Sequence, residues 1–290
     1  MTDSAAEAPC LGVYLYCLAR PECIPVVDGL AEQEVRGVDE RYPVVALQDA
    51  GMVAVVGDVD TGEFCDQNLQ AISWVGPRAF RHEAVVERLM GASSVLPVKF
   101  GTIFRSHARL KEFLGRHRED IVRVLDDLRD KTEWSVKGYL AEDDARKMVS
   151  ASDPSIQDRV AALSASPGAR YLQQKQLDAS IDTALRVWLE RVTHDLEETL
   201  DRHAVAATEL RCHASAVSGR SERMVFNCSF LVTAAALPNF RAAFSDQQRA
   251  YKRRGMTLEL RGPWPPYNFC PALSDAEPSR IQSVPSGRRA

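Results

Sequence analysis

The chain has 290 residues, of which 45% are hydrophobic, and this length favours two moderate domains over one. Its 36 Lys and Arg against 40 Asp and Glu give a net charge of -4, which argues against a nucleic-acid-binding protein. Charged residues at 26%, with 16 Gly and 15 Pro, are typical of globular proteins and argue against a disordered or fibrous chain.

The sequence also argues against membrane insertion and secretion. No apolar run approaches the ~20 residues of a membrane-spanning helix, and Asp3 and Glu7 stand where a signal peptide would be basic and then apolar. The seven cysteines are an odd number without a C-x-x-C pair, which is typical of reduced thiols. We therefore expect a cytoplasmic protein with no membrane or nucleic-acid partner.

The first predicted elements are strands. Residues 11–18 (LGVYLYCL) are apolar on both alternating faces and predict a central strand covered on both sides. Apolar residues at 44–47 and 52–56 flank the turn-like segment 48–51 and predict a hairpin. An antiparallel sheet is therefore expected near the N-terminus.

Helical spacing follows over residues 64–91. Leu69 and Ile72 are among the apolar positions of this pattern, and Gly76-Pro77 is expected to divide it into two helices. These helices are expected to cover one face of the sheet.

A further strand, helix and strand are predicted next. Residues 95–100 form a short apolar strand, and Ser106 is expected to cap a helix that residues 120–128 continue. Residues 134–140 return to strand alternation. Because strands and helices mingle without a repeating β-α-β period, we expect an α+β fold.

The middle of the chain is predicted to be largely helical. Residues 141–165 have a helical pattern that Asp153-Pro154 breaks, and residues 164–168 (SASPG) are the best candidate linker. Over residues 170–203, apolar residues keep three- or four-residue steps and predict an amphipathic helix about 50 Å long.

The order of elements after the long helix suggests a known unit. Strands are predicted near 207–212 and 224–232, a helix at about 238–254 and a strand at 257–260. With the strand at 134–140, this is the β-α-β-β-α-β order of a ferredoxin-like unit.

We therefore expect an α+β protein of two domains with antiparallel sheets and helices. The C-terminal, ferredoxin-like domain would include a helical linker segment at 141–168 and the long amphipathic helix at 170–203. The expected division is a disordered N-terminus at 1–10, an N-terminal α+β domain at 11–133, the C-terminal domain at 134–270 and a disordered tail at 271–290.

The sequence offers no catalytic, cofactor-binding or metal site. It contains no G-x-S-x-G, G-x-x-x-x-G-K-[ST], G-x-G-x-x-G or H-E-x-x-H motif. His82, Glu83 and Glu87 diverge around a helix, so we interpret them as a solvated or hydrogen-bonded helix face. Cys212 and His213 point to opposite sides of a strand. We expect no enzyme and no cofactor.

The segment 258–269 (LELRGPWPPYNF) is unusual because three prolines present Trp264, Tyr267 and Phe269 from a stiff backbone. It is either a rigid strap packed over the sheet, with Trp264 buried, or a docking surface for another chain.

Lys252, Arg253 and Arg254 end the last predicted helix. Two interpretations are open: the three positive side chains are solvated and interact favourably with the dipole at the helix C-terminus, or they contact an acidic partner.

Four segments stand in this order along the chain: 13–16 (VYLY), 96–102 (LPVKFGT), 227–232 (NCSFLV) and 262–269 (GPWPPYNF). Together they resemble the GvpL/GvpF family of gas vesicle proteins. The resemblance covers about residues 11–270, and it includes His82-Glu83, residues 133–137 (EWSVK) and residues 168–172 (GARYL). Lys99 stands where arginine is common in the family.

The resemblance implies a non-enzymatic accessory protein of gas vesicle assembly, with roles in buoyancy, that binds the hydrophobic shell protein and other accessory proteins in the cytoplasm. Trp264, Tyr267, Phe269 and the 252–254 triplet are the expected partner-binding residues. Two alternatives remain: a minor structural component retained in the vesicle, and a small-molecule enzyme on a ferredoxin-like scaffold, which would need a pocket with convergent titratable groups.

Overall fold

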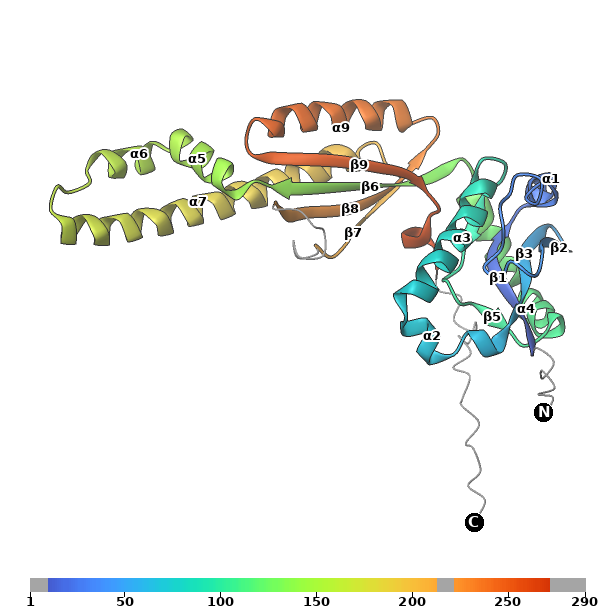
Figure 1. Ribbon diagram of the computed structural model, residues 1–290. Helices are drawn as coiled ribbons and strands as arrows, with labels where there is room; N and C mark the ends of the chain where they lie inside the picture. The colour runs from blue at the N-terminus through green and yellow to red at the C-terminus, as the bar shows by residue number, and fades with distance from the viewer. Residues whose placement is uncertain (1–9, 213–221, 272–290) are drawn as a thin grey trace, which may run out of the picture. The chain divides into compact units, whose positions relative to one another are not determined.

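The computed structural model describes residues 10–212 and 222–271, and the chain divides into two compact units (Figure 1). Unit 1 contains Met1–Asp130 together with Pro265–Ala290, and unit 2 contains Lys131–Trp264. The chain therefore passes from one unit to the other twice. The expected C-terminal domain ended at residue 270, whereas the chain returns to unit 1 at Pro265. Apart from residues 10 and 271, the expected disordered ends lie outside the described residues.

Unit 1 is built on a five-stranded antiparallel sheet. The central strand β1 is buried at all but its first residue, because side chains from its two faces enter two different core clusters. This confirms the prediction of a strand covered on both sides. The sheet order is β2 (Val44–Asp49), β3 (Met52–Asp60), β1 (Leu11–Ala19) and β4 (Val95–Pro97), with β5 (Ile103–Phe104) also paired to β1.

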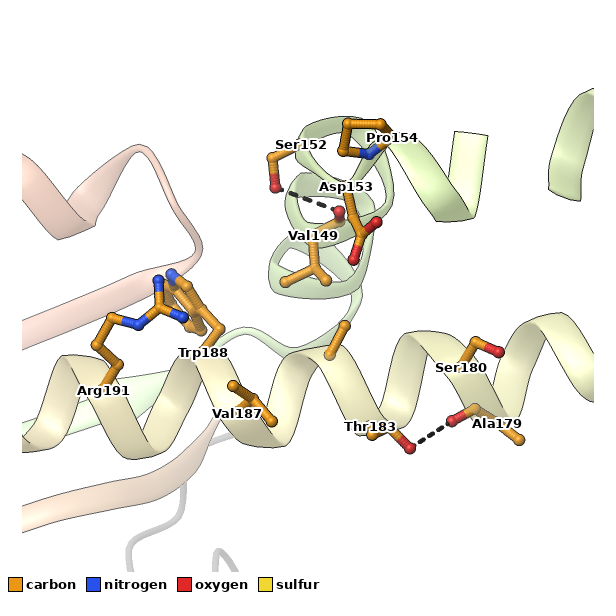
Figure 2. A pocket seen from close by; sticks show the side chains of 11 residues that line it. Val149, Ser152, Asp153, Pro154, Ala179, Ser180, Thr183, Val187, Trp188 and Arg191 are labelled. Carbon is orange, nitrogen blue, oxygen red and sulfur yellow. Dashed lines mark hydrogen bonds between the residues drawn. The ribbon is translucent and has the colours of Figure 1, made fainter. Parts of the chain in front are cut away.

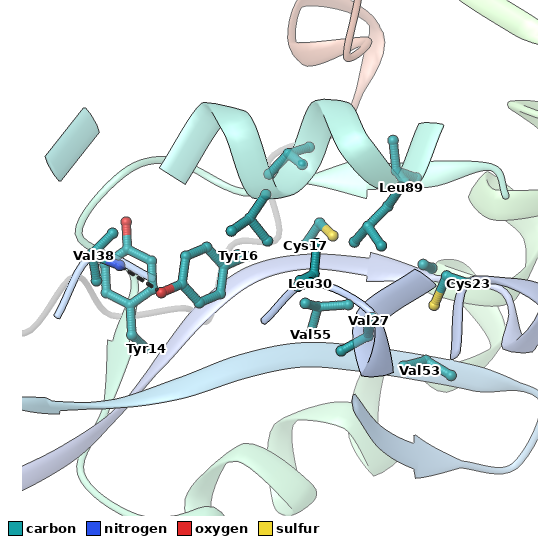
Figure 3. Packing of buried hydrophobic residues seen from close by; sticks show 14 of the residues in the cluster. Tyr14, Tyr16, Cys17, Cys23, Val27, Leu30, Val38, Val53, Val55 and Leu89 are labelled. Carbon is teal, nitrogen blue, oxygen red and sulfur yellow. Dashed lines mark hydrogen bonds between the residues drawn. The ribbon is translucent and has the colours of Figure 1, made fainter. Parts of the chain in front are cut away.

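Helices complete the two cores of unit 1. Val85, Val86 and Leu89 of α3 (Ile72–Met90) pack in the cluster that contains Tyr14 and Tyr16 (Figure 3). The helix α4 (His107–Asp127) packs in the other cluster, and the Ser106 hydroxyl caps it by accepting a hydrogen bond from Arg109 N–H at 3.3 Å. The predicted cap is thus confirmed.

The helical segment before residue 91 divides at a different place from the expected one. The short α2 (Asp66–Gln70) ends at Ala71, which has extended backbone angles, and α3 then continues through Pro77. A proline usually excludes helix at the preceding residue by clashing with its Cβ. Gly76 has no Cβ, so the helix tolerates the proline at the loss of one hydrogen bond.

The predicted strand at 95–100 is also shorter than expected. It ends at Pro97, which has no N–H to offer the ladder. The chain then turns, with Thr102 N–H donating to the Lys99 carbonyl at 3.2 Å.

Unit 2 has a four-stranded antiparallel sheet whose order is β7-β8-β6-β9. The connection order through strands and main helices is the β-α-β-β-α-β order that the sequence predicts. In both units the second strand lies at one edge, followed by the third, the first and the fourth strand of that unit: β2-β3-β1-β4 in unit 1 and β7-β8-β6-β9 in unit 2. In unit 2 the elements are β6 (Lys131–Leu140), α7 (Pro167–Asp201), β7 (Ala206–Glu209), β8 (Arg223–Thr233), α9 (Leu237–Lys252) and β9 (Met256–Trp264).

The long helix α7 contributes side chains to two hydrophobic clusters of unit 2. Its C-terminal half packs with α9 and the sheet through Val192, Leu196 and Leu200. Its N-terminal half packs against α5 (Glu142–Ser152) and α6 (Pro154–Ala161), which lie along it (Figure 1). At 35 residues, α7 spans about 50 Å, as expected.

The connection at residues 164–168 does not join the two units. It lies inside unit 2 between α6 and α7, and Pro167 occupies the first turn of α7, where the missing N–H is harmless. The SASPG segment is therefore a helix connection rather than an interdomain linker. No helix of the described part of the chain is long and apolar enough to cross a membrane.

Candidate functional site

The six expected partner-binding residues are divided between the two units. Trp264 ends β9 in unit 2 and is 37% exposed, while Lys252, Arg253 and Arg254 are exposed at the end of α9. The half-buried Tyr267 and Phe269 belong to a short 3-10 helix, η3 (Tyr267–Phe269), in unit 1. Their roles in partner binding stay predictions.

The sequence motifs of unit 1 meet at a buried histidine. His82, on α3, is 2% exposed, and its Nδ1 lies 2.9 Å from the Tyr14 hydroxyl of β1. Its Nε2 lies 3.1 Å from the Tyr267 hydroxyl, which donates to Glu83 Oε2 at 3.0 Å. The opening strand, the His82-Glu83 pair and the C-terminal segment are therefore joined by one polar chain.

The two ends of this chain fix the direction of its hydrogen bonds. At one end, Gly101 N–H donates to the Tyr14 hydroxyl at 3.1 Å, and a backbone N–H can only donate. At the other end, an ionised Glu83 can only accept. The Tyr14 hydroxyl therefore donates to Nδ1 of His82, and Nε2–H donates to the Tyr267 hydroxyl. This assigns His82 as the neutral Nε2–H tautomer.

Burial holds the members of the chain in these states. Desolvation lowers the pKa of His82 to about 4, against a backbone hydrogen bond with Val98 that raises it. Burial likewise raises the pKa of the Tyr14 hydroxyl. Burial, followed by the Glu83 carboxylate, raises the pKa of the Tyr267 hydroxyl. At neutral pH the histidine and both phenols are thus uncharged.

Aromatic packing fixes the position of the imidazole. The Tyr16 ring stacks on His82 with centroids 5.7 Å apart, and the Phe100 ring meets it edge-on at 6.0 Å. The Tyr16 hydroxyl accepts a hydrogen bond from Val38 N–H at 2.8 Å (Figure 3). Gly101 has a φ of +84°, a conformation that favours glycine and that aims its N–H at Tyr14.

The arrangement fastens the C-terminal segment to unit 1 and presents no open reaction centre. The polar atoms joined in the chain are paired with one another, and His82 is enclosed by aromatic rings. For Tyr267 this geometry favours the strap interpretation over the docking interpretation. No group of three or more His, Cys, Asp or Glu side chains within residues 10–212 and 222–271 is arranged to hold a metal ion.

A second feature of unit 1 is a set of exposed apolar side chains on its first helices, which we call the α3 apolar group: Leu69, Ile72 and Phe80. Ile72 is 83% and Phe80 76% exposed, and Leu69 on α2 is also exposed. Ile72 and Phe80 stand two turns apart on α3. The expectation that Leu69 and Ile72 face the sheet is wrong, because both side chains are exposed, while Trp74 and the residues from His82 onward are the ones that α3 turns to the core.

Unit 2 also exposes large apolar side chains near the tip of its helical extension. Tyr171 and Leu172, which end the GARYL segment at the start of α7, are exposed, as is Val160 on α6. Lys175 Nζ lies 5.2 Å from the centre of the Tyr171 ring.

Comparison with known proteins agrees with the motif resemblance. The family model for "Gas vesicle synthesis protein GvpL/GvpF" matches residues 12–271. Over 260 residues the chain is 26% identical to gas vesicle protein L of a Streptomyces strain, covering 88% of this chain and 91% of that protein. Over 275 residues it is 25% identical to gas vesicle protein L2 of Halobacterium salinarum, covering 93% and 95%.

Solved structures share the fold. The crystal structure of gas vesicle protein GvpF from Anabaena superposes with a TM-score of 0.64 at 18% identity, over 90% of this chain and 98% of that one. The GvpF structure from Microcystis aeruginosa gives a TM-score of 0.62 at 17% identity, over 89% and 98%. The α+β fold is therefore common to all three chains. By its family match over nearly its whole length, the chain belongs to the GvpL/GvpF family of gas vesicle synthesis proteins.

Proposed function

We propose that this chain is a non-enzymatic accessory protein of gas vesicle assembly that works in the cytoplasm, in association with the vesicle, and binds the hydrophobic shell protein together with other accessory proteins. The observation that carries the proposal is the α3 apolar group in a chain of this family. A shell subunit with an apolar gas-facing surface aggregates before assembly unless that surface is covered. Ile72 and Phe80 offer such a cover.

The enzyme alternative predicts a pocket with convergent titratable groups. In unit 2, the cleft between α5, α6 and α7 has two charged lining residues, Asp153 and Arg191. The Asp153 carboxylate caps α6, accepting from Ser155 N–H at 2.9 Å and Ile156 N–H at 3.4 Å. A carboxylate engaged in this way is not free to act as a general base, which supports the non-enzymatic proposal.

A co-expression pull-down with the shell protein tests the proposal. The tagged chain is expected to capture the shell protein, and the double variant Ile72→Ser with Phe80→Ser is expected to lose most of this capture. The matched control replaces Leu11 and Val45, two other exposed apolar residues of unit 1, with serine and should bind as wild type. Equal capture by both double variants would contradict a role for the α3 apolar group, and no capture by wild type would contradict shell binding.

Retention in the mature vesicle is a separate question that mass spectrometry of washed vesicles answers. A transient assembly factor is expected to be absent from them. Its presence in a fixed ratio to the shell protein would instead favour a structural component.

A further inference from the structure

Unit 2 combines an open cleft with two sheet edges. The cleft between α5, α6 and α7 is lined by Asp153 and Arg191, whose opposite charges favour no charged partner (Figure 2). The edges of the sheet are formed by β7 and β9 (Figure 1). No strand of residues 10–212 or 222–271 pairs with the outer side of either edge strand. An edge strand of this kind is a template for pairing with another chain.

The two edge strands run in opposite directions. Each neighbouring pair in the order β7-β8-β6-β9 is antiparallel, so three reversals separate β7 from β9. A second copy that is shifted sideways across the strands, without rotation, therefore brings its β7 antiparallel to β9. This pairing continues the antiparallel sheet from one copy into the next.

Hydrogen bonds show which residues of β9 direct their backbone groups outwards. Ala141 N–H donates to the Gly255 carbonyl at 2.8 Å, in the register of the β6–β9 pair, so Gly255 faces β6. Successive residues of an antiparallel strand alternate in direction, so Leu258 and Leu260 face outwards. In agreement, the Gln248 side chain of α9 donates to the Leu258 carbonyl at 2.8 Å. Gln248 thus covers the edge at Leu258, and Leu260 is the open position.

The same reasoning applies to β7. Leu210 N–H donates to the Asn227 carbonyl at 2.8 Å, which continues the register of the β7–β8 pair. Leu210 therefore faces β8, and Glu209 before it directs its N–H and carbonyl outwards.

The two outward positions stand at the same level of the sheet. The residues that pair across the four strands at this level are Glu209, Cys228, Val136 and Leu260. In two copies placed side by side, Leu260 of one copy is therefore opposite Glu209 of the other. Each N–H can donate to the carbonyl of the opposite residue, as in a hydrogen-bonded pair of an antiparallel ladder.

The β9 edge is basic. Arg241 and Lys252 lie seven residues before and four residues after Gln248, so they share the flank of α9 that contacts β9. Both are exposed, and neither forms an ion pair with a residue that the structure describes. On β9 itself, Arg261 pairs with Glu259 at 3.4 Å, so these two charges offset each other. The two positive charges of α9 are therefore unmatched on this flank.

The β7 edge is acidic. Burial, followed by the Glu197 carboxylate, raises the pKa of the Cys228 thiol to about 12, and the carboxylates of Glu209 and Asp201 also raise it. These three carboxylates therefore lie near β8, on the β7 side of the sheet. All three are exposed and form no ion pair within the described part of the chain. Arg211, two residues beyond Glu209, offsets one of the three charges.

Each edge also has an exposed apolar side chain at the same end of the sheet. Trp264, the last residue of β9, is 37% exposed, and Val205, just before β7, is 56% exposed. The positions that pair across the four strands at this end are Trp264, Glu133, Leu231 and Ala206, the neighbour of Val205. Packing the two exposed side chains together would remove apolar surface from water.

We propose that this chain binds a second copy of itself, with the β9 edge of one copy against the β7 edge of the other. Leu260 and Glu209 exchange backbone hydrogen bonds, and Trp264 packs at the Val205 end. Arg241 faces the acidic flank of α7. Because the two edges differ, the contact is head-to-tail and leaves a free edge on each outer copy, so further copies add in a row. This self-association goes beyond the proposed function and does not depend on shell binding.

Two charge reversals test the contact in the purified full-length chain, with sedimentation velocity as the measurement. Wild type is expected to associate as its concentration rises, and Arg241→Glu and Asp201→Lys are each expected to weaken association about tenfold at low salt. A mixture of the two variants should associate as wild type, because each reversed edge then meets a complementary one. Arg170→Glu, at an exposed position near the start of α7, is the control and should associate as wild type.

A proline at position 209 tests the backbone pairing. Glu209→Pro removes an N–H that faces away from β8, so unit 2 should keep its fold while self-association falls about tenfold or more. Glu209→Ala removes the same carboxylate but keeps the N–H, and it should retain more association than Glu209→Pro. Circular dichroism of both variants checks that the fold is intact.

The outcomes are separate from those of the proposed function. Wild type that stays monomeric at every concentration would overturn the inference. Association of wild type that neither the charge reversals nor Glu209→Pro weakens would place the contact elsewhere and would overturn it as well. Neither result bears on shell binding, which the co-expression pull-down measures.

Discussion

The Nε2 atom of His82 and the hydroxyl of Tyr267 lie 3.1 Å apart although 185 positions separate them in the sequence. Between the two residues the chain leaves unit 1, forms the whole of unit 2 and returns at Pro265. This contact fastens the returning segment to α3.

Tyr267→Phe should destabilise unit 1 by about 1–3 kcal/mol, because it leaves the Nε2–H of His82 and the Glu83 carboxylate without their shared partner. Denaturant unfolding followed by circular dichroism measures the change. Tyr171→Phe, at an exposed tyrosine, is the matched control and should unfold as wild type. Equal denaturant midpoints for the two variants would show that the hydroxyl of Tyr267 does not stabilise the folded chain.

The stability of unit 1 should fall as the pH drops below neutrality. The pKa of His82 is lowered to about 4 in the folded chain, against an ordinary value of 6.5. Between these two pH values the histidine is protonated in the unfolded chain and neutral in the folded chain. The free energy of unfolding therefore falls by about 3 kcal/mol from pH 6.5 to pH 4. Unfolding of wild type and His82→Gln at pH 7 and pH 5 checks this. The same loss in both proteins would assign the effect to other groups.

Gly101→Ala should destabilise the protein by about 1–2 kcal/mol, since alanine is strained at a φ of +84°. Gly115→Ala is the contrasting variant. It lies exposed inside α4 with open space around its Cα, and alanine there should stabilise the helix by about 0.5–1 kcal/mol. Thermal unfolding of both variants tests whether the left-handed backbone at Gly101 requires glycine. Melting temperatures that shift in the same direction in both variants would contradict this requirement.

Trp264→Ala should cost far less than the ~3 to 5 kcal/mol that removal of a fully buried aromatic side chain costs. Trp264 is 37% exposed at the end of β9, which differs from the buried strap that one interpretation of the sequence predicts. We expect the free energy of unfolding to fall by at most about 1.5 kcal/mol, and the variant to capture clearly less shell protein or accessory protein than wild type. An unfolded or strongly destabilised variant would restore the buried interpretation.

Replacing Lys252, Arg253 and Arg254 with Glu should weaken binding to an acidic accessory protein, more at low salt than at high salt. All three side chains are exposed at the end of α9. Binding that matches wild type at both salt concentrations would leave the triplet as a solvated helix end. Charge reversal at Arg186 and Arg202, also on exposed helix surface, serves as the control.

Local patterns predicted most of the elements. The double-faced apolar pattern of residues 11–18 and the regular steps of residues 170–203 correspond to β1 and α7. Ser106 caps a helix as its side chain predicts, and the helical pattern of residues 141–165 breaks at Asp153-Pro154 as expected. These signals are strong because each depends on residues within one or two turns of each other.

Features that depend on distant partners were not predictable in the same way. The burial of His82 follows from tyrosines 68 and 185 positions away, and no local pattern reports them. Helical spacing places Ile72 on the apolar stripe of α3, yet its side chain is 83% exposed, because spacing alone does not report which side chains meet the core. The chain returns to unit 1 at Pro265, where Tyr267 contacts residues about 185 positions away, and no local pattern reports such contacts.

The most direct measurement of the central claim is the fraction of shell protein that stays in the supernatant when it is co-expressed with this chain and the other accessory proteins. We predict that wild type keeps a large fraction of the shell protein in the supernatant, in a complex that can be captured on the tagged chain, and that Ile72→Ser with Phe80→Ser does not. If the shell protein sediments to the same extent with and without this chain, the account is contradicted.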